Sequence, residues 1–506
     1  MDFKANKIFS RCILALLSIL LWHSPLQAAG STDSRLAGAV KRRDIKAALS
    51  LLEQKADVNA PQADGATALQ WAAHWDDLET AELLIRAGAN ASAANAYGVT
   101  ALSLACTNGS AAMVEKLLNA GARPNVVTLT GETPLMTCAA TGSADAMKLL
   151  LDHGATVNTA ENERGQTALM WAAAGSHTEA VRVLMEHGAD LQARSKGGFT
   201  ALLFAAQQGC VECARLLLAA GANVNEATEE TGSALVVAAA SGREALAKFL
   251  LEQGADPNAA DIYGITALHY AVQKGISDIS GFEYRPSHQA PPNMPELVKA
   301  LLERGANPNA RIARVFPRYS RSPFPPTITM VGATPLLLAA ASADFEMMKA
   351  LLSSGADVKL ATIENTSVLM AASGVGQVQD RTDDEAKRAL QAVALAAKLG
   401  NDVNQANDAG HTALHGAALT GGDAIIQFLA DQGANVNAVT KYRIRPRRLP
   451  VTPLDLAQGE GPIPHPHKST EELLLRLGGH KAAKTAPGQG SDPAPYQAEK
   501  QPSAKE

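Results

Sequence analysis

Aromatic residues are scarce in this sequence. Phe, Trp and Tyr make up 4% of the 506 residues, whereas 46% are hydrophobic and glycine alone occurs 40 times. A core of this composition has to be built from small side chains, chiefly Ala and Leu, packed closely together. Charged residues, at 19%, and a net charge of −5 favour neither a disordered chain nor a nucleic-acid binder, which is usually basic overall. We therefore expect a folded protein that binds no nucleic acid.

Cysteine is also rare, with five residues in the whole chain. One of them, Cys12, lies in the N-terminal segment, which leaves four for the rest of the protein. Small secreted domains that lack a sufficient core are cross-linked by many disulfides, and four cysteines are far too few to do this for so long a chain. A disulfide-based scaffold is therefore excluded.

Long apolar runs are absent after residue 28, so we expect no transmembrane helix and a soluble mature chain. At the N-terminus, basic residues precede an apolar run from Cys12 to Trp22 that is too short to span a bilayer. The sequence SPLQAAG then offers a cleavage point near Ala28 or Ala29. We predict that residues 1–28 are a signal peptide and that the protein is periplasmic or secreted. An amphipathic start to the first repeat is the alternative, against which Pro25 argues.

The strongest feature of the sequence is an internal repeat. A segment related to Thr-Ala-Leu-x-x-Ala-Ala begins at Thr67, Thr100, Thr133, Thr167, Thr200, Ser233, Thr266, Thr334, Thr366, Thr412 and Thr452. Thr and Ser are typical helix N-caps, and a later Leu-rich run usually ends in Gly-Ala, where Gly is typical of a left-handed helix end. Each unit is thus predicted to contain two short helices. A single helix pair cannot bury its apolar face, so the units must stack.

This pattern resembles the ankyrin repeat, which has a period of 33 residues and the signature Thr-Pro-Leu-His-x-Ala. The resemblance implies an all-α solenoid of about twelve helix pairs with β-hairpin loops. We place it at residues 34–479, with an N-terminal cap at 34–65 and a C-terminal cap at 452–479. Residues 480–506, rich in Ala, Pro, Lys and Gln, are predicted to be disordered. Resemblance to exported bacterial members implies a non-enzymatic, monomeric scaffold without a cofactor, which binds a periplasmic protein partner.

One position of each first helix is predicted to face the partner. At 100° per residue, the residue two after the recurring Leu lies opposite the buried face, on the side that forms the concave groove of ankyrin proteins. Together with a tryptophan one turn later, this position predicts a partner-binding groove of Trp71, Trp75, Leu104, Trp171, Phe204, Tyr270, Leu338 and Met370. The alternative is that these side chains lie back on neighbouring repeats as half-buried packing.

Departures from the period predict inserted loops. Residues 277–293 and the sequence GQVQDRTDDE fall between the two helices of a repeat, whereas residues 311–331 and 439–450 extend hairpin loops. The two hairpin insertions are basic and contain tyrosines, which predicts a second binding edge made of Arg311, Arg314, Arg318, Tyr319, Arg321, Lys441, Tyr442, Arg443, Arg445, Arg447 and Arg448. Such an edge suits an acidic partner or adhesion to an anionic polymer such as lipid headgroups. Solvated loops are the simpler interpretation.

Enzyme signatures are missing from the chain: there is no G-x-S-x-G, P-loop, H-E-x-x-H or dinucleotide-binding glycine motif. His269 and His415 occupy the histidine of the ankyrin signature, where the family's histidine is structural. The pair His465 and His467 could bind a metal only with a third ligand that the sequence does not supply, so we expect no metal site. A catalytic cluster within the insertions, which contain Glu283 and His288, is a remote alternative.

The four cysteines outside the N-terminal segment have a default interpretation as small buried apolar residues. Cys106 and Cys138 replace Ala in the recurring Ala-Ala pair. Cys210 and Cys213 stand in the order Cys-Val-Glu-Cys at the start of a predicted second helix, which is also the setting of a redox pair. In an oxidising compartment these two can form a disulfide. A thiol oxidoreductase is disfavoured because the βαβ pattern that usually surrounds such a motif is absent.

Overall fold

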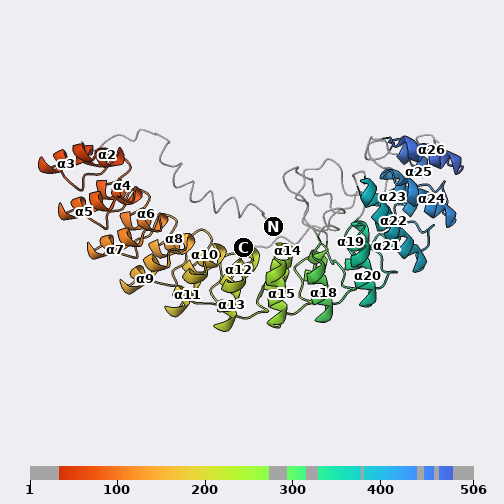
Figure 1. Cartoon of the computed structure of the whole chain (residues 1–506), viewed down its shortest axis with the longest axis horizontal. Helices are drawn as coiled ribbons and strands as arrows, with labels where there is room; N and C mark the ends of the chain where they lie inside the picture. Colours follow the sequence, from red (N-terminus) through yellow and green to blue (C-terminus); the bar gives the residue numbers. More distant parts are fainter. Residues whose placement is uncertain are drawn as a thin grey trace, which may run out of the picture. The chain divides into compact units, whose positions relative to one another are not determined.

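A computed structural model describes residues 33–272, 293–314, 329–377, 381–441, 450–460 and 466–482. The chain divides into two compact units, and each is a stack of helix pairs (Figure 1). Of the described residues, unit 1 contains 33–272 and 293–314, and unit 2 contains those from 329 onward. The predicted signal peptide lies outside the described residues and stays a prediction.

Unit 1 alternates first helices, which follow a hairpin loop, with second helices, which precede the next one. Its first helices are α2 (Arg35–Lys41), α4 (Ala68–His74), α6 (Ala101–Thr107), α8 (Pro134–Thr141), α10 (Ala168–Ala174), α12 (Ala201–Gln208), α14 (Ala234–Ala240) and α16 (Ala267–Ala271). Its second helices are α3 (Ile45–Glu53), α5 (Leu78–Arg86), α7 (Ala111–Asn119), α9 (Ala144–Asp152), α11 (Thr178–Glu186), α13 (Val211–Ala219), α15 (Glu244–Glu252) and α18 (Pro295–Glu303).

Unit 2 repeats the same alternation. Its first helices are α19 (Pro335–Ala341), α21 (Val368–Ser373), α23 (Ala413–Leu419) and α25 (Pro453–Ala457). Its second helices are α20 (Phe345–Ser353), α22 (Asp383–Lys398), α24 (Asp423–Asp431) and α26 (Lys468–Arg476). The predicted all-α repeat fold is therefore confirmed.

The helix boundaries follow from the capping residues that the repeat supplies. Thr100, for example, has extended backbone angles and its hydroxyl accepts the Ser103 N–H at 3.1 Å, which satisfies a donor that the helix itself cannot. Second helices end at a left-handed residue, usually glycine, such as Gly88 with φ of 88°. In the first repeat Lys55 takes this conformation, with φ of 59°, although a side chain makes it less favourable.

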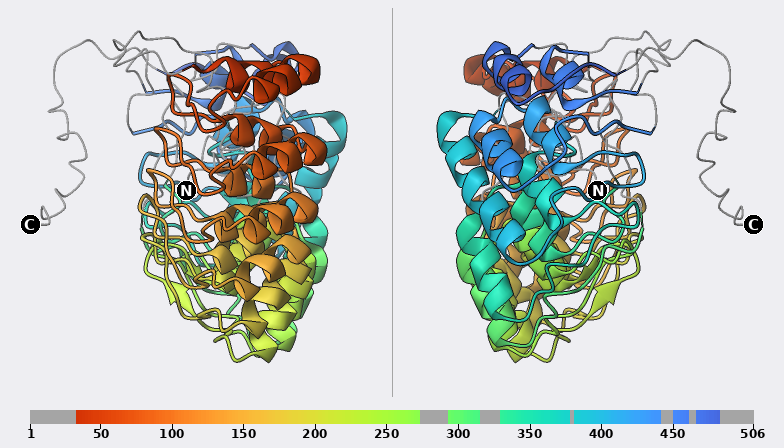
Figure 2. Two further views of the ribbon diagram at one scale, coloured as in Figure 1. Left: turned by 90° about the vertical axis from the view of Figure 1, so that its left-hand side faces the viewer. Right: turned by 90° about the vertical axis from the view of Figure 1, so that its right-hand side faces the viewer.

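Neighbouring repeats are joined through their hairpins and loops. In unit 1 the hairpins gather along one edge of the stack and the helices along the other (Figure 2). β1 (Ala227–Thr228) and β2 (Gly232–Ser233) form an antiparallel hairpin, and most hairpin tips bond to the next, as in Leu129 N–H to the Tyr97 carbonyl at 3.0 Å. Because the tips are so close, a Cβ on Gly98, whose φ is 78°, would lie 2.6 Å from the Val127 carbonyl. Only glycine fits there.

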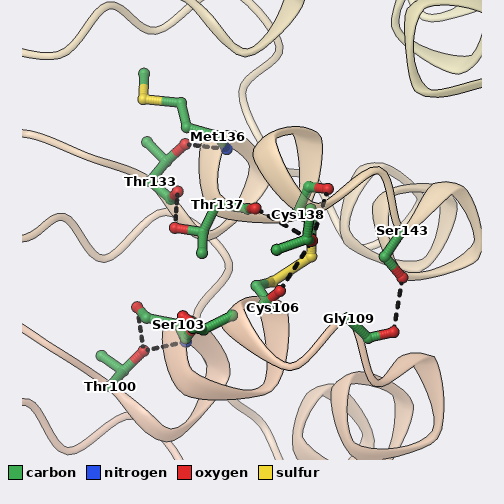
Figure 3. The surroundings of a disulfide bond; sticks show 11 residues. Thr100, Ser103, Cys106, Gly109, Thr133, Met136, Thr137, Cys138 and Ser143 are labelled. Carbon is green, nitrogen blue, oxygen red and sulfur yellow. Dashed lines mark hydrogen bonds between the residues drawn. A yellow bond between two sulfur atoms is a disulfide. The ribbon is translucent and has the colours of Figure 1, made fainter. Parts of the chain in front are cut away.

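The core of each unit consists largely of the recurring Ala-Ala pairs and the Leu residues around them, nearly all fully buried. Where first helices α6 and α8 meet, the pair contributes cysteine instead. The structure joins Cys106 and Cys138 in a disulfide with a Cα–Cα distance of 4.6 Å (Figure 3). Our default interpretation of these two residues as unpaired buried apolar side chains was therefore wrong. The small residues that let the helices approach also bring the two sulfurs together.

One predicted helix start is displaced by a residue. α21 is capped by Ser367, whose hydroxyl accepts the Met370 N–H at 3.3 Å, and not by Thr366. The Thr366 N–H is held instead by the Thr362 hydroxyl at 3.1 Å, within the preceding hairpin, so Thr366 stays outside the helix. The whole helix is consequently one residue out of register with the prediction.

The insertion around GQVQDRTDDE, predicted as extra residues between helices, mostly lengthens a helix. α22 has 16 residues, whereas most second helices have nine. Thr382 caps it in a reciprocal arrangement with Glu385, whose carboxylate accepts the Thr382 N–H at 3.0 Å. The sequence Thr-Asp-Asp-Glu is a capping-box signature, which overrides the loop prediction here.

The first residues of the predicted disordered tail are ordered. The His480 N–H donates to Asn437 at 2.8 Å and the Ala482 N–H donates to the Asp455 carboxylate at 3.0 Å. The tail prediction was therefore wrong for residues 480–482, which complete the last repeat. The remaining tail, from 483 to 506, lies outside the described residues.

Candidate protein-binding surface

The predicted groove position is the fourth residue of each first helix, and its exposure changes along unit 1. Leu104, Trp171 and Phe204, on α6, α10 and α12, are half-buried and keep part of their surface open. Phe204 also contacts Phe199 of its own hairpin, with 5.3 Å between ring centroids. Trp75, one turn after this position on α4, is 42% exposed. These four side chains form the accessible part of the predicted groove.

Trp71 and Tyr270 occupy the same position but are buried, at 6% and 7% exposed, so their prediction as groove surface was wrong. In both cases the polar end of the ring reaches back to the residue nine positions earlier, at the base of its own hairpin. The Trp71 indole N–H donates to Gln62 at 2.9 Å, and the Tyr270 hydroxyl donates to Asp261 at 2.7 Å. Burial raises the pKa of the Asp261 carboxyl. A hydrogen-bonding tip therefore folds these rings onto the hairpin.

Leu338 and Met370 are also buried, and their prediction as groove residues was wrong as well. Leu338 lies fully buried in the middle of α19. Met370 is buried because α21 begins one residue later than predicted. This places Met370 at the third helical position, which is buried in every described repeat.

The predicted basic edge lies mostly outside the described residues. Arg311, Arg314 and Lys441 are described and exposed. The Lys441 N–H donates to the Ala409 carbonyl at 2.9 Å, so its backbone continues the hairpin ladder. Arg318, Tyr319, Arg321, Tyr442, Arg443, Arg445, Arg447 and Arg448 are not described, and the basic edge stays a prediction.

Three apolar side chains that the sequence analysis did not single out are exposed at two neighbouring hairpins of unit 1. Leu129 stands at a hairpin tip with 72% of its surface exposed, and Tyr97 and Val127 lie beside it, both exposed. We call these three residues the fingertip cluster. The signal in the sequence was an apolar residue at a hairpin tip, where most other repeats place a polar or small one. Exposed apolar groups that gather in this way mark interaction sites.

A cavity of about 330 Å³ lies further along the same edge of unit 1, between the hairpin after α11 and the β1–β2 hairpin. Arg194 and Lys196 line it from one hairpin, and Glu229 and Glu230 from the next. The Arg194 guanidinium is fixed by the buried Glu226 carboxylate at 2.7 Å. This cavity, which we call the notch, thus presents both signs of charge next to the apolar groove position of α12.

The residues considered for catalysis or metal binding have structural roles where they are described. His269 and His415 complete capping boxes with Thr266 and Thr412, and their other ring nitrogens bond to backbone carbonyls. His467 precedes α26 at the N-cap position, and its ring bonds to the Leu419 carbonyl at 3.3 Å. Within the described residues no group of three or more potential ligands is placed to hold a metal ion. Glu283, His288 and His465 lie outside them.

Cys210 and Cys213 are joined by a disulfide at the N-terminus of α13. The default interpretation of both as unpaired apolar residues was thus wrong, and the disulfide alternative describes them. No helix in the described parts of the chain is both long and apolar enough to cross a bilayer.

The fold defines a helical repeat protein, and one edge of unit 1 exposes apolar and charged side chains. A family model for ankyrin repeats in three copies matches residues 36–128, 114–195, 156–228, 191–261, 220–312 and 336–440. The chain therefore belongs to the ankyrin-repeat family, whose members are generally scaffolds for protein–protein interaction and typically have no enzymatic activity.

One solved structure similar to this chain is the human ASB11 ankyrin repeat domain. The two are 26% identical over 44% of this chain and 98% of that domain, with a TM-score of 0.40. No match was found among curated protein sequences.

Proposed function

We propose that this protein is a non-enzymatic scaffold, exported to the periplasm or beyond, that binds a protein partner along the first helices and hairpins of unit 1. The observation that carries the proposal is the exposed apolar surface there. Leu104, Trp171 and Phe204 are open on the helices, and the fingertip cluster is open on the hairpins. Aromatic side chains such as Trp171, Phe204 and Tyr97 are enriched at protein interfaces.

The mixed charges beside this surface support a protein partner over an anionic polymer. Lys196 and Glu230 line the same notch, so the edge offers both donors and acceptors at the border of an apolar strip. An apolar centre with a polar rim is the usual anatomy of a protein interface. A polymer of uniform negative charge would be repelled by Glu229 and Glu230.

Export is supported by the order of basic and apolar residues at the N-terminus and by the two disulfides. Disulfides persist in oxidising compartments and are rare in the cytosol of most cells. Protein recovered from the periplasm or medium should begin near Ala29. An intact Met1 on protein recovered only from the cytosol would remove this part of the proposal.

The binding proposal is tested with one hairpin variant and one matched control. Leu129→Ser removes the most exposed apolar side chain of the fingertip cluster, and Leu83→Ser removes a leucine that is exposed on the second helix α5. We expect a partner captured by the wild-type chain to bind Leu129→Ser at least about tenfold more weakly, and to bind Leu83→Ser normally. Equal binding to both variants would contradict the proposed surface.

A further inference from the structure

The disulfide between Cys210 and Cys213 has no evident structural task. Cys210 is the N-cap of α13, in the turn that follows α12, and Cys213 is the third residue of α13, with a Cα–Cα distance of 5.3 Å between them. This turn is at the C-terminal end of the first helix, away from the hairpins. The proposed binding surface therefore does not use it.

Other repeats show that neither position needs a cysteine. At the N-cap, Asp77 and Ser110 accept the same backbone N–H that the Cys210 sulfur accepts. At the third helical position, Ala146 and Ala180 fill the place of Cys213 and are equally buried. The bond spans a separation of three residues inside one turn, so it ties no repeat to another. Compared with those residues, the two cysteines add only a disulfide bond that can be reduced and formed again.

The two sulfurs differ in access. Cys213 is fully buried, whereas Cys210 keeps part of its surface open to solvent. Of the two residues, Cys210 is therefore the one that an incoming thiolate meets first. Both cysteines of the Cys106–Cys138 bond, in contrast, are fully buried, which makes that bond an internal reference in the same unit.

The surroundings of Cys210 favour a negatively charged sulfur. Its Sγ accepts the Cys213 N–H at 3.2 Å, at a nine-residue helix whose N-terminus carries partial positive charge. The Thr178 hydroxyl of the preceding repeat lies 3.8 Å from the Cys210 sulfur and 3.7 Å from the Cys213 sulfur, so it can donate to either. Arg243 of the following repeat packs against Gly209, and its Nε donates to the Gln207 carbonyl at 3.1 Å.

The one acidic side chain between the two cysteines is paired. Glu212 lies 3.3 Å from Arg215 one turn along the exposed side of α13. Its carboxylate is thus partly neutralised and directed along the helix. Reactive cysteines in proteins are found in partly exposed, electropositive settings of this type.

We propose that Cys210 and Cys213 form a thiol–disulfide exchange site that oxidises a dithiol of another protein. A thiolate of that protein attacks the Cys210 sulfur, the bond between Cys210 and Cys213 breaks, and Cys213 leaves with the electron pair and takes up a proton. The second thiolate of the protein then attacks its own sulfur in the mixed disulfide, and Cys210 leaves as a thiolate held by the Cys213 N–H. The other protein loses two electrons to form its disulfide and this chain gains them, with one proton on Cys213 and Cys210 left as the thiolate.

The first test follows both disulfides of the folded, oxidised full chain during reduction by dithiothreitol without denaturant. Samples are alkylated at successive times and the four cysteine peptides are quantified by mass spectrometry. We expect the Cys210–Cys213 bond to open at least about tenfold faster than the Cys106–Cys138 bond, because only its sulfur is accessible. One dithiothreitol should be oxidised for each bond opened. Equal rates, or opening only together with unfolding, would overturn the proposal.

The second test asks which sulfur is attacked. Cys213→Ala leaves Cys210 as the free thiol and Cys210→Ser leaves Cys213, and both substitutions place a residue that other repeats already carry at that position. With the chromogenic disulfide dithionitrobenzoate, we expect Cys213→Ala to react at least about tenfold faster than Cys210→Ser. Faster reaction of Cys210→Ser would contradict the proposed direction of attack. The double variant should show the same helical content and no reaction.

Discussion

The same repeat presents its first-helix face differently in two regions of the molecule. From α6 to α12 in unit 1 the fourth helical position stays half-open, with Leu104, Trp171 and Phe204. From α19 to α25 in unit 2 the equivalent residues, Leu338, Ala371, Gly416 and Leu456, are all buried. An apolar residue at this position can therefore serve either binding or the core, depending on what packs beside it.

The difference lies partly in the residue at this position and partly in what packs beside it. In unit 2 the lengthened α22 also packs against α19, and small residues such as Ala371 and Gly416 leave little side chain to expose. In unit 1 the second helices have nine residues, and the rings of Trp171 and Phe204 are half-buried. This comparison supports the proposed partner binding by unit 1, and four experiments test it.

The largest stability effect is expected where unit 1 is cross-linked between repeats. Replacing Cys106 and Cys138 by Ala, the residue at the equivalent positions of other repeats, should lower the free energy of unfolding around α6 and α8 by about 4 kcal/mol. Hydrogen exchange resolved by peptide measures this loss locally. The Cys210–Cys213 bond closes a much shorter loop. Replacing Cys210 by Ser and Cys213 by Ala should therefore lower the free energy of unfolding by about 2 kcal/mol or less. The reverse order would contradict the assigned roles.

Next in size is the removal of a buried side chain from unit 2. Leu338→Ala should destabilise the region around α19 by about 3 kcal/mol, because the side chain is fully buried and leaves a cavity. Denaturant unfolding monitored by hydrogen exchange in α19 and α21 measures this loss of stability. A loss below about 1 kcal/mol would mean that this face of unit 2 is open, and the contrast between the regions would disappear.

Unit 2 should also be sensitive to acid. Burial lowers the pKa of His411 to about 4 and that of His415 to about 3, with His411 adding to the effect on His415. In the unfolded chain both histidines bind protons as the pH falls below about 6.5, whereas in the folded chain they stay neutral. Their contribution to stability is therefore complete above that pH and is lost as the pH falls toward the folded pKa of about 4 for His411 and about 3 for His415.

The size of the acid effect is about 2 kcal/mol per histidine between pH 6.5 and pH 5. His415→Gln provides the matched control, since Gln70 fills the same position in α4 and forms the same capping box. This variant should lose part of the acid sensitivity around α23 and keep its fold at pH 7. Hydrogen exchange at pH 7 and pH 5, corrected for intrinsic rates, compares the wild-type chain with His415→Gln. Unchanged acid sensitivity would exclude His415 as its source.

Much of the fold could be predicted because the repeat carries its own boundary signals. Thr100 caps its helix as expected, and the glycine at nearly every second-helix end is where the chain turns left-handed. The prediction failed at Thr366 because Thr and Ser stand side by side and both can cap. The Thr366 N–H donates to the Thr362 hydroxyl within the hairpin. In other repeats the equivalent bond, such as Val99 N–H to Asn95, also ends at the residue just before the cap, and our prediction did not include this spacing.

The site was less predictable because side-chain exposure depends on contacts between elements. Nothing in the repeat indicates that Gln62 and Asp261 fold Trp71 and Tyr270 onto their hairpins. The bond between Cys106 and Cys138 did leave a signal: their separation of 32 residues is one less than the usual period, which places them on facing sides of adjacent first helices. The fingertip cluster could have been found by comparing hairpin tips across repeats.

The most direct test of the account measures stability and binding together for Phe204→Ala. Phe204 is half-open at the centre of the proposed surface, so its removal should cost about 1 kcal/mol of stability, less than the 3–5 kcal/mol of a buried ring. The affinity of the captured partner should fall by about 2 kcal/mol, close to thirtyfold. Full affinity in Phe204→Ala, with a stability loss of about 3 kcal/mol or more, would make Phe204 a core residue and contradict the binding surface on unit 1.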